Sequence, residues 1–143
     1  MTVHIIKLCV GVESVEELAQ WQSKRIADLK KKKKPLELMH VTRATPKRAE
    51  EVLDGGSLYW VIKGQIAARQ KLLDLKPVTK NGTPHCGLVY EPQLIPVKRR
   101  HHRAFQGWRY LDPKDAPPDL RIPKSGKGLP EALQAELVTL GLL

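Results

Sequence analysis

The stretch LYWVIK, residues 58–63, decides the fold because it is the clearest β-strand in the sequence. Its first, third and fifth side chains are apolar and would share one face of a strand, while Tyr59 and Val61 would share the other. Since both faces are apolar enough to be covered, we predict that this strand lies in the centre of a sheet.

Three further segments have the patterns of strands. Residues 3–10 (VHIIKLCV) are mostly apolar and rich in residues that favour strands. In residues 36–42 (LELMHVT), apolar and polar side chains alternate over the first positions, and residues 86–90 (CGLVY) form a further short strand pattern. The segment QIAARQKLLDL at 65–75 is ambiguous, because its composition favours a helix but its apolar residues do not form one stripe. Gly64, directly ahead of it, could turn the chain back on itself, and we predict a hairpin there.

Helix signals occur at three places. SVEE at residues 14–17 is a capping box, and the helix that it begins should run to about Lys33. A threonine N-cap followed by proline predicts a second helix over Pro46–Leu53, which a Gly-Gly pair closes. A short last helix is predicted over Leu129–Leu140, where proline comes near the start and glycine follows the end.

Proline is concentrated in the second half of the chain, since nine of the eleven prolines lie from Pro77 onward. Residues 92–130 are therefore predicted to form an extended, proline-rich segment that wraps around a core built mainly from the first ninety residues. Helices that alternate with strands, followed by strands in succession, indicate an α+β fold. We predict a single domain over residues 1–143, with a mixed or antiparallel sheet and two or three helices.

The net charge of +10 comes from two segments. Residues 24–48 hold ten basic and two acidic side chains, and residues 98–109 hold five basic and none acidic. Charge gathered in this way is typical of a binding face for an anionic partner, with nucleic acid as the first candidate. If folding scatters the two segments, the charge would contribute only to solubility.

Several classes of protein are disfavoured. No apolar run approaches the roughly 18 residues of a membrane span, and the N-terminal residues do not resemble a signal peptide, so we expect a cytoplasmic protein. No serine lies in a Gly-x-Ser-x-Gly motif. His85-Cys86 and His101-His102 lack metal-site spacing, and Lys124–Gly128 fails the phosphate-loop pattern. We predict no catalytic residue, no metal site and no cofactor.

The start of the second predicted helix is the first candidate site. Lys47 and Arg48 would lie in its first turn, where basic residues oppose the helix dipole and where free amides favour an anion. Together with Arg43 and Thr45 they are predicted to bind a phosphate. The alternative is that Glu50 and Glu51 pair with these basic side chains.

The second candidate site is KRRHHRAFQGWRY, residues 98–110, where basic and aromatic residues are interleaved. Basic side chains neutralise phosphates, and aromatic rings stack on unpaired bases. The alternative is that the aromatic residues face inward and anchor the wrapping segment to the core. The residues predicted to contact nucleic acid are, together with those of the first site, Arg69, Lys98, Arg99, Arg100, Arg103, Trp108, Arg109 and Tyr110.

Two resemblances bear on these candidates. Arg43–Gly64 (RATPKRAEEVLDGGSLYWVIKG), Ala104–Leu111 (AFQGWRYL) and Ala116–Leu120 (APPDL) resemble a bacterial family of single-domain proteins of unknown function, which implies no established activity. More loosely, a short helix, a Gly-Gly turn and a strand with Tyr-Trp over residues 45–90 are similar to RNA-binding barrels of the PUA and ASCH kind. This second resemblance implies a PUA-like partial barrel and raises the expectation of a nucleic-acid partner.

Three functions follow from these observations. The leading prediction is a non-enzymatic domain that binds nucleic acid, in particular structured RNA. The second is an enzyme acting on a nucleotide or another anionic small molecule, in a pocket lined by Arg43, Arg69, Trp60 and Arg109, with His85 or His40 as acid or base. The third is a protein-interaction module for an acidic partner. A deep pocket with a titratable group would favour the enzyme, and an open basic groove would favour nucleic acid.

Overall fold

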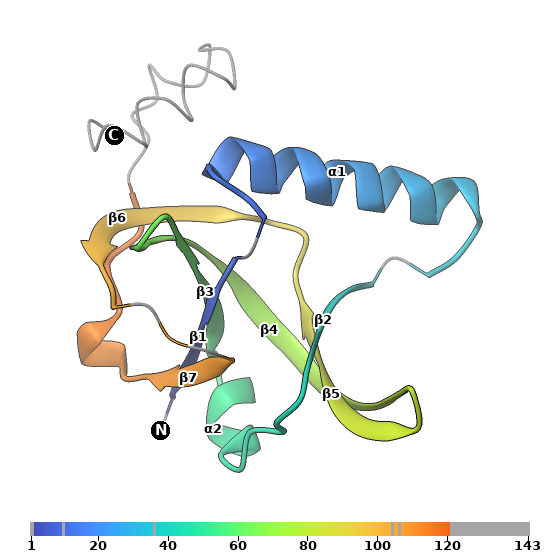
Figure 1. Ribbon diagram of the computed structural model, residues 1–143. Helices are drawn as coiled ribbons and strands as arrows, with labels where there is room; N and C mark the ends of the chain where they lie inside the picture. The colour runs from blue at the N-terminus through green and yellow to red at the C-terminus, as the bar shows by residue number, and fades with distance from the viewer. Residues whose placement is uncertain (1, 10, 36, 104, 106, 121–143) are drawn as a thin grey trace.

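Seven strands form one mixed sheet in the computed structural model, with α1 across one end and α2 at the opposite end (Figure 1). The structure describes residues 2–9, 11–35, 37–103, 105 and 107–120. The elements, in chain order, are β1 (His4–Leu8), α1 (Val15–Lys31), β2 (Leu38–Thr42), α2 (Ala49–Leu53), β3 (Ser57–Ile62), β4 (Gln65–Lys80), β5 (Thr83–Tyr90), β6 (Ile95–His101), β7 (Trp108–Leu111) and the 3-10 helix η1 (Pro113–Asp115). The predicted α+β class is confirmed.

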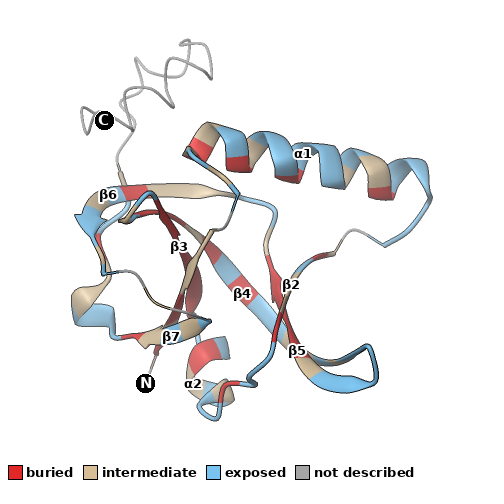
Figure 2. Ribbon diagram, viewed as in Figure 1, coloured by how far each residue is buried: buried red, intermediate tan, exposed pale blue. Residues whose placement is uncertain are grey.

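The sheet is built around β3, as the sequence predicted. The strand order is β2-β5-β4-β3-β1-β7, and β6 also pairs with β4. β3 runs parallel to β1 and antiparallel to β4, and all six of its residues are buried (Figure 2). Leu58, Trp60 and Ile62 join one apolar cluster of the core, whereas Tyr59 and Val61 join a second cluster on the opposite face.

β4 confirms the predicted hairpin and is longer than predicted. The turn at Lys63-Gly64 has positive φ at both residues, +50° and +74°, which suits a two-residue hairpin. The strand continues to Lys80, pairing with β3 and β6 along its first part and with β5 along its second part. Irregularities in register at Ala67 and Leu73 place an extra residue in the strand. They break the alternation of faces, which is why the segment lacked a clear strand pattern.

α1 begins with the predicted capping box. The amide of Glu17 donates to the Ser14 hydroxyl over 3.1 Å, and the Glu17 carboxylate accepts from the amide of Glu13 over 2.8 Å. The helix ends at Lys31, slightly earlier than predicted, and Lys33 adopts a left-handed φ of +55° just beyond it. The side of α1 that faces the sheet is buried, as Figure 2 shows.

A buried network of amides fastens α1 to the sheet. Gln22 and Gln70 exchange two hydrogen bonds, of 2.8 and 2.7 Å, between their side chains. Gln70 also accepts from the indole N–H of Trp60 over 2.9 Å and donates to the carbonyl of Glu91 over 3.0 Å. Every donor and acceptor of the Gln70 amide is therefore used, which removes the cost of burying it.

α2 is shorter than predicted. The prediction of Pro46–Leu53 was wrong at its start, because the helix begins at Ala49 and Arg48 is the N-cap, without a capping hydrogen bond from its side chain. The backbone N–H of Arg48 instead donates to the hydroxyl of Tyr110 over 3.1 Å. Lys47 and Arg48 consequently do not lie in a first helical turn.

The predicted Gly-Gly closure after α2 is confirmed. Gly55 has a φ of +82°, and a side chain at Gly56 would collide with the carbonyl oxygens of Val52 and Val3. This close approach lets the chain pass from α2 into β3 beside the start of β1.

The segment predicted to wrap around the core supplies two strands of the sheet. β6 pairs with the first part of β4, and β7 pairs antiparallel with β1. Val97 and Leu111 from these strands are buried in the second apolar cluster. The predicted helix Leu129–Leu140 and the Lys124–Gly128 segment lie outside the described residues.

We expect Gln70→Leu to lower the free energy of unfolding by about 3 kcal/mol, because it leaves the Trp60 indole and the Gln22 amide buried without partners. Urea unfolding measures this loss. Gln65→Leu, an exposed change on the same strand, is the control and should be close to neutral. Stability of Gln70→Leu within about 0.5 kcal/mol of wild type would contradict the role of the network.

Candidate ligand pocket and basic surface

The loop at residues 43–48, called here the basic loop, is held against β7. The indole N–H of Trp108 donates to the carbonyl of Ala44 over 2.8 Å, and the Tyr110 hydroxyl accepts from the backbone of Arg48. The rings of Trp108 and Tyr110 pack edge to face, with centroids 4.9 Å apart. The two aromatic residues predicted to stack on bases therefore position the basic loop in this structure.

Members of the basic loop differ in their availability to a ligand. Arg43 and Lys47 are exposed, and neither forms an ion pair with any described residue. Arg48 makes two hydrogen bonds to the Glu51 carboxylate, of 2.6 and 2.9 Å. For Arg48, therefore, the alternative prediction of pairing with an acidic residue of the second helix holds. Thr45 is exposed, and it partly offsets the rise that burial causes in the pKa of the Cys86 thiol. Arg43 and Lys47 are thus the cations of this loop that remain open to an anion.

The second basic segment lies on β6 and just after it. Lys98, Arg100 and Arg103 are exposed, although Arg100 donates to the carbonyl of Asp115 over 2.8 Å. Arg99 is half-buried, which lowers its pKa, and its Nε is buried without a hydrogen-bond partner among the described residues. Arg109, on β7, is exposed with its guanidinium 5.7 Å from the centre of the Phe105 ring.

The two positive segments come together only in part. The basic loop is bonded to β7, the strand that contains Trp108 and Arg109 at the end of the second segment. Residues 30–34, which carry half of the basic side chains of the first segment, lie at the C-terminal end of α1. Figure 1 shows this end of α1 and the C-terminal end of β6 on opposite sides of the molecule. The lysine run is therefore not part of the same surface.

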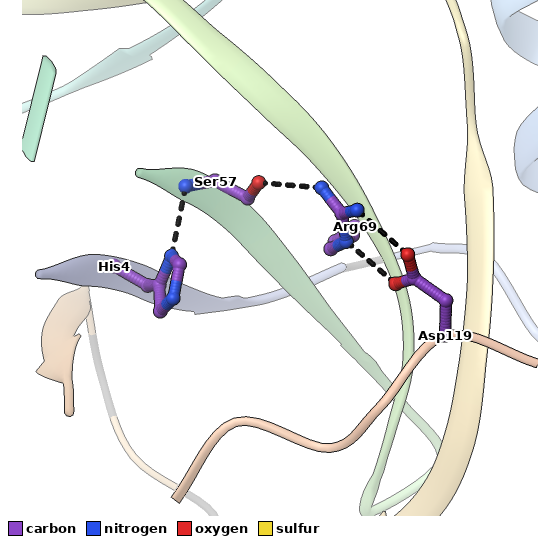
Figure 3. Close-up of polar contacts among 4 residues, drawn as sticks. All are labelled: His4, Ser57, Arg69 and Asp119. Atoms are coloured by element: carbon purple, nitrogen blue, oxygen red, sulfur yellow. Dashed lines mark hydrogen bonds and ion pairs between the residues drawn. The ribbon is translucent and has the colours of Figure 1, made fainter. Parts of the chain in front are cut away.

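Arg69 is committed to a polar network (Figure 3). Its guanidinium binds the carboxylate of Asp119 through two hydrogen bonds of 2.7 Å and donates to the Ser57 hydroxyl over 2.9 Å. The amide of Ser57 donates to Nδ1 of His4 over 3.0 Å, so the neutral ring of His4 carries its proton on Nε2. Burial and the charge of Arg69 both lower the pKa of His4. This network joins the β1-β3-β4 region to the segment after η1.

A small cavity of about 290 Å³ lies between α1 and the sheet. It is mostly apolar, and the residues that line it come from β1, the loop after β1, α1, β2, β3 and β5. They are Lys7, Leu8, Cys9, Gly11, Val12, Leu18, Trp21, Met39, His40, Trp60 and Tyr90. We refer to this cavity as the pocket.

The polar groups of the pocket are one cation and three groups that are neutral at pH 7. Burial and the positive charge of Lys7 lower the pKa of His40 to about 4. Burial raises the pKa of the Cys9 thiol to about 11 and that of Tyr90 to about 12. Burial also lowers the pKa of Lys7, since desolvation penalises its charged form. The pocket thus contains a titratable cation, a neutral imidazole, a thiol and a phenol.

The residues of the predicted enzyme pocket do not assemble. Trp60 and His40 line the pocket, with their rings edge to face at 5.6 Å. Arg43 and His85 instead share a polar hollow of about 490 Å³ beside the β4-β5 turn. Arg69 is in the network with Asp119. Arg109 does not line any of these cavities, but lies over Phe105.

Of the eleven residues that line the pocket, only His40 and Trp60 were predicted from the sequence, and Lys7, Trp21 and Met39 are the missed residues most open to a ligand. Lys7 had a visible signal, because it is the only lysine or arginine in the first predicted strand. Trp21 had a weaker signal, as an aromatic residue on the flank of the apolar stripe of the first helix. Met39 had none, since an isolated methionine in a strand is more often a core residue.

The fold defines an α+β protein that carries an apolar pocket and a partly divided basic surface. The chain matches, over residues 5–143, the model of a family described as a protein of unknown function, DUF1489, and it belongs to that family. Neither a curated protein nor a solved structure matches it. The predicted family is confirmed, whereas the PUA-like resemblance stays a prediction.

None of the helices in the described part of the chain has the length and hydrophobicity that a membrane span requires. In that same part of the chain, no three of the histidine, cysteine, aspartate and glutamate side chains are grouped as metal ligands would be.

We expect Asp119→Asn to be less stable than wild type by about 1 kcal/mol at pH 7, because the pair with Arg69 is partly exposed and screened. The hydrogen bonds from Arg69 lower the pKa of Asp119, so its contribution is present above the unfolded pKa of about 3.9 and is lost as pH falls through the folded pKa. Urea unfolding at pH 7 and about pH 2 should show the difference disappearing in acid. Asp28→Asn, in an exposed helix pair, is the control.

We expect the imidazole of His40 to titrate at about pH 4 in an NMR experiment, because burial and Lys7 both disfavour its charged form. Lys7→Gln removes the second cause and should raise this pKa. Titration of His40 near the ordinary histidine value of about 6.5 would show that its ring is solvated and is not affected by burial or by Lys7.

Proposed function

We propose that this protein binds nucleic acid through exposed basic side chains, and that its partner is structured RNA. The proposal rests on exposed basic side chains that form no ion pair with a described carboxylate. They lie on the basic loop and on the second basic segment, on β6 and just after it. These cations are Arg43, Lys47, Lys98, Arg100 and Arg103.

Exposed cations of this kind suit contacts with phosphates. An unpaired arginine or lysine keeps its charge for a ligand, and each phosphate contact releases condensed counterions. The attachment of the basic loop to β7 supports the proposal, because it holds Arg43 and Lys47 next to the strand that carries Arg109, the last basic residue of the second segment. The resemblance of residues 45–90 to RNA-binding barrels directs the proposal toward RNA rather than DNA.

The structure narrows the set of residues that could contact phosphates. Asp119 neutralises Arg69 and Glu51 neutralises Arg48, so we assign neither a leading role. Trp108 and Tyr110 act through the basic loop that they hold. Substituting them would therefore alter the loop itself and would not test stacking on bases.

The double variant Arg43→Ala and Lys47→Ala tests the proposal with Arg48 left in place. We expect it to bind a structured RNA hairpin about tenfold more weakly at 100 mM salt, because two phosphate contacts are lost. The slope of log affinity against log salt should become shallower by about 1.5 to 2. Fluorescence anisotropy over a salt series measures both quantities.

Lys33→Ala with Lys34→Ala is the matched control, since it removes the same charge from the far end of α1. It should change binding much less than the loop variant. Equal losses in the two variants would show that only total charge matters, and unchanged binding in both would contradict the proposal. Equally strong binding of polyglutamate would instead indicate a surface for acidic proteins.

A further inference from the structure

Lys7, on β1, carries a positive charge at the pocket without an acidic partner among the described residues. It is the only lysine or arginine of β1, where it lies beside Trp60 of β3 in the parallel register. Lys7 is half-buried and lines the pocket, and its ammonium group forms no hydrogen bond or ion pair with any described residue. A partly desolvated charge without a partner is costly, and an anionic ligand would offset that cost.

Large apolar side chains remain exposed at the same pocket. Trp21 is 56% exposed and Met39 is 38% exposed, and they are two of the four large hydrophobic residues that are exposed in the described part of the chain. Both line the pocket, although they come from different elements, α1 and β2. Exposed apolar surface gathered at one cavity is typical of a binding site for an apolar or aromatic group.

The opposite wall of the pocket is rigidly placed. The indole of Trp60 is fixed by its hydrogen bond to Gln70, which the Gln22 amide holds in turn. The edge-to-face contact between His40 and Trp60 orients the imidazole as well. As a neutral ring, His40 offers one donor and one acceptor to the edge of a ligand. Because these side chains are already ordered in the free protein, less conformational entropy is lost when a ligand binds.

We propose that the pocket binds a single nucleotide unit, with its base packed against Trp21 and Trp60 and its phosphate on Lys7. A volume of about 290 Å³ lies below the range of sites for drug-sized molecules, so it suits one ring system. The exposed indole of Trp21 fits the face of a base, whereas Trp60, which is 3% exposed, contributes only the part of its ring that lines the pocket. His40 fits the polar edge of the base, and the ammonium group of Lys7 fits its phosphate.

The same chemistry is present in a free mononucleotide and in an unpaired nucleotide of an RNA. The second form rests on the proposed function. The chain favours this form because β2 leads from His40 in the pocket to its end at Thr42, and Arg43 of the basic loop follows directly, three residues and about 10 Å of extended chain beyond His40. A base in the pocket and a neighbouring phosphate on Arg43 could thus belong to one RNA strand.

Titration with AMP, UMP and the corresponding nucleosides, followed by NMR chemical shifts, tests the pocket directly. In the wild-type protein we expect a nucleotide to bind at least about tenfold more tightly than its nucleoside, because only the nucleotide reaches Lys7 with a phosphate. Lys7→Gln should remove this difference. Trp21→Ala should weaken nucleotide and nucleoside alike by about tenfold, since it removes one aromatic wall.

Two matched variants guard against general effects. Lys114→Gln removes the same charge at an exposed position of η1, and Leu73→Ala removes an exposed apolar side chain from β4; both should bind like wild type. Trp21 is more than half exposed, so Trp21→Ala should remain folded, which its NMR spectrum shows directly. Equal affinity for nucleotide and nucleoside, no shifts at about 10 mM nucleotide, or equally tight binding of benzoate would overturn the assignment.

The RNA experiment separates this inference from the proposed function. Nucleotide binding without RNA binding would support the pocket and contradict the proposed function. RNA binding that Trp21→Ala weakens and that AMP or UMP competes with would support both. RNA binding that depends on Arg43 and Lys47, in a protein whose pocket residues do not respond to nucleotide, would support the proposed function and overturn the pocket.

Discussion

The hydrogen bonds between Gln22 and Gln70 are the interaction on which most of the remaining structure depends. They join α1 to β4 through the middle of the core, at positions where apolar side chains would be expected. Because the Gln70 amide also holds Trp60 and the carbonyl of Glu91, a single side chain sets the relative positions of α1, β3 and the chain after β5. The pocket lies between the same elements, so its shape depends on this buried polar network.

Local sequence patterns correctly predicted the elements that one pattern is enough to identify, such as strand alternation or a helix capping box. The alternation in residues 58–63 was sufficient for β3, and the capping box was sufficient for the start of α1. β4 was harder, because the extra residues at Ala67 and Leu73 change which face the side chains occupy. β6 and β7 were not predicted at all, since their basic residues hide the alternation and since each pairs with a strand far away in the sequence.

The prediction of the candidate sites from the sequence failed where interactions between distant residues decide which side chains are available. The predicted start of α2 was wrong because Arg48 has a φ of −92° and a ψ of +44°, outside the helical range, and its backbone N–H is bound by Tyr110, 62 positions away. Arg69 was a reasonable phosphate ligand by residue type, yet Asp119, 50 positions further on, occupies its guanidinium. The exposure of Arg43 and Lys47 was predictable from their local sequence. Their arrangement beside β7 was not, because it depends on Trp108 and Tyr110.

The place of β1 between β3 and β7 has a consequence for how the chain folds during synthesis. β3, β4 and β5 are neighbours in sequence and can pair as soon as they are made, whereas the two partners of β1 lie about fifty and one hundred residues further along. At a typical rate of about 5–20 residues per second, the first strand waits about 5 to 20 seconds for its second partner. During that interval the edge of β1 that finally binds β7 stays open to other strands, and the sheet is completed only when most of the chain has left the ribosome.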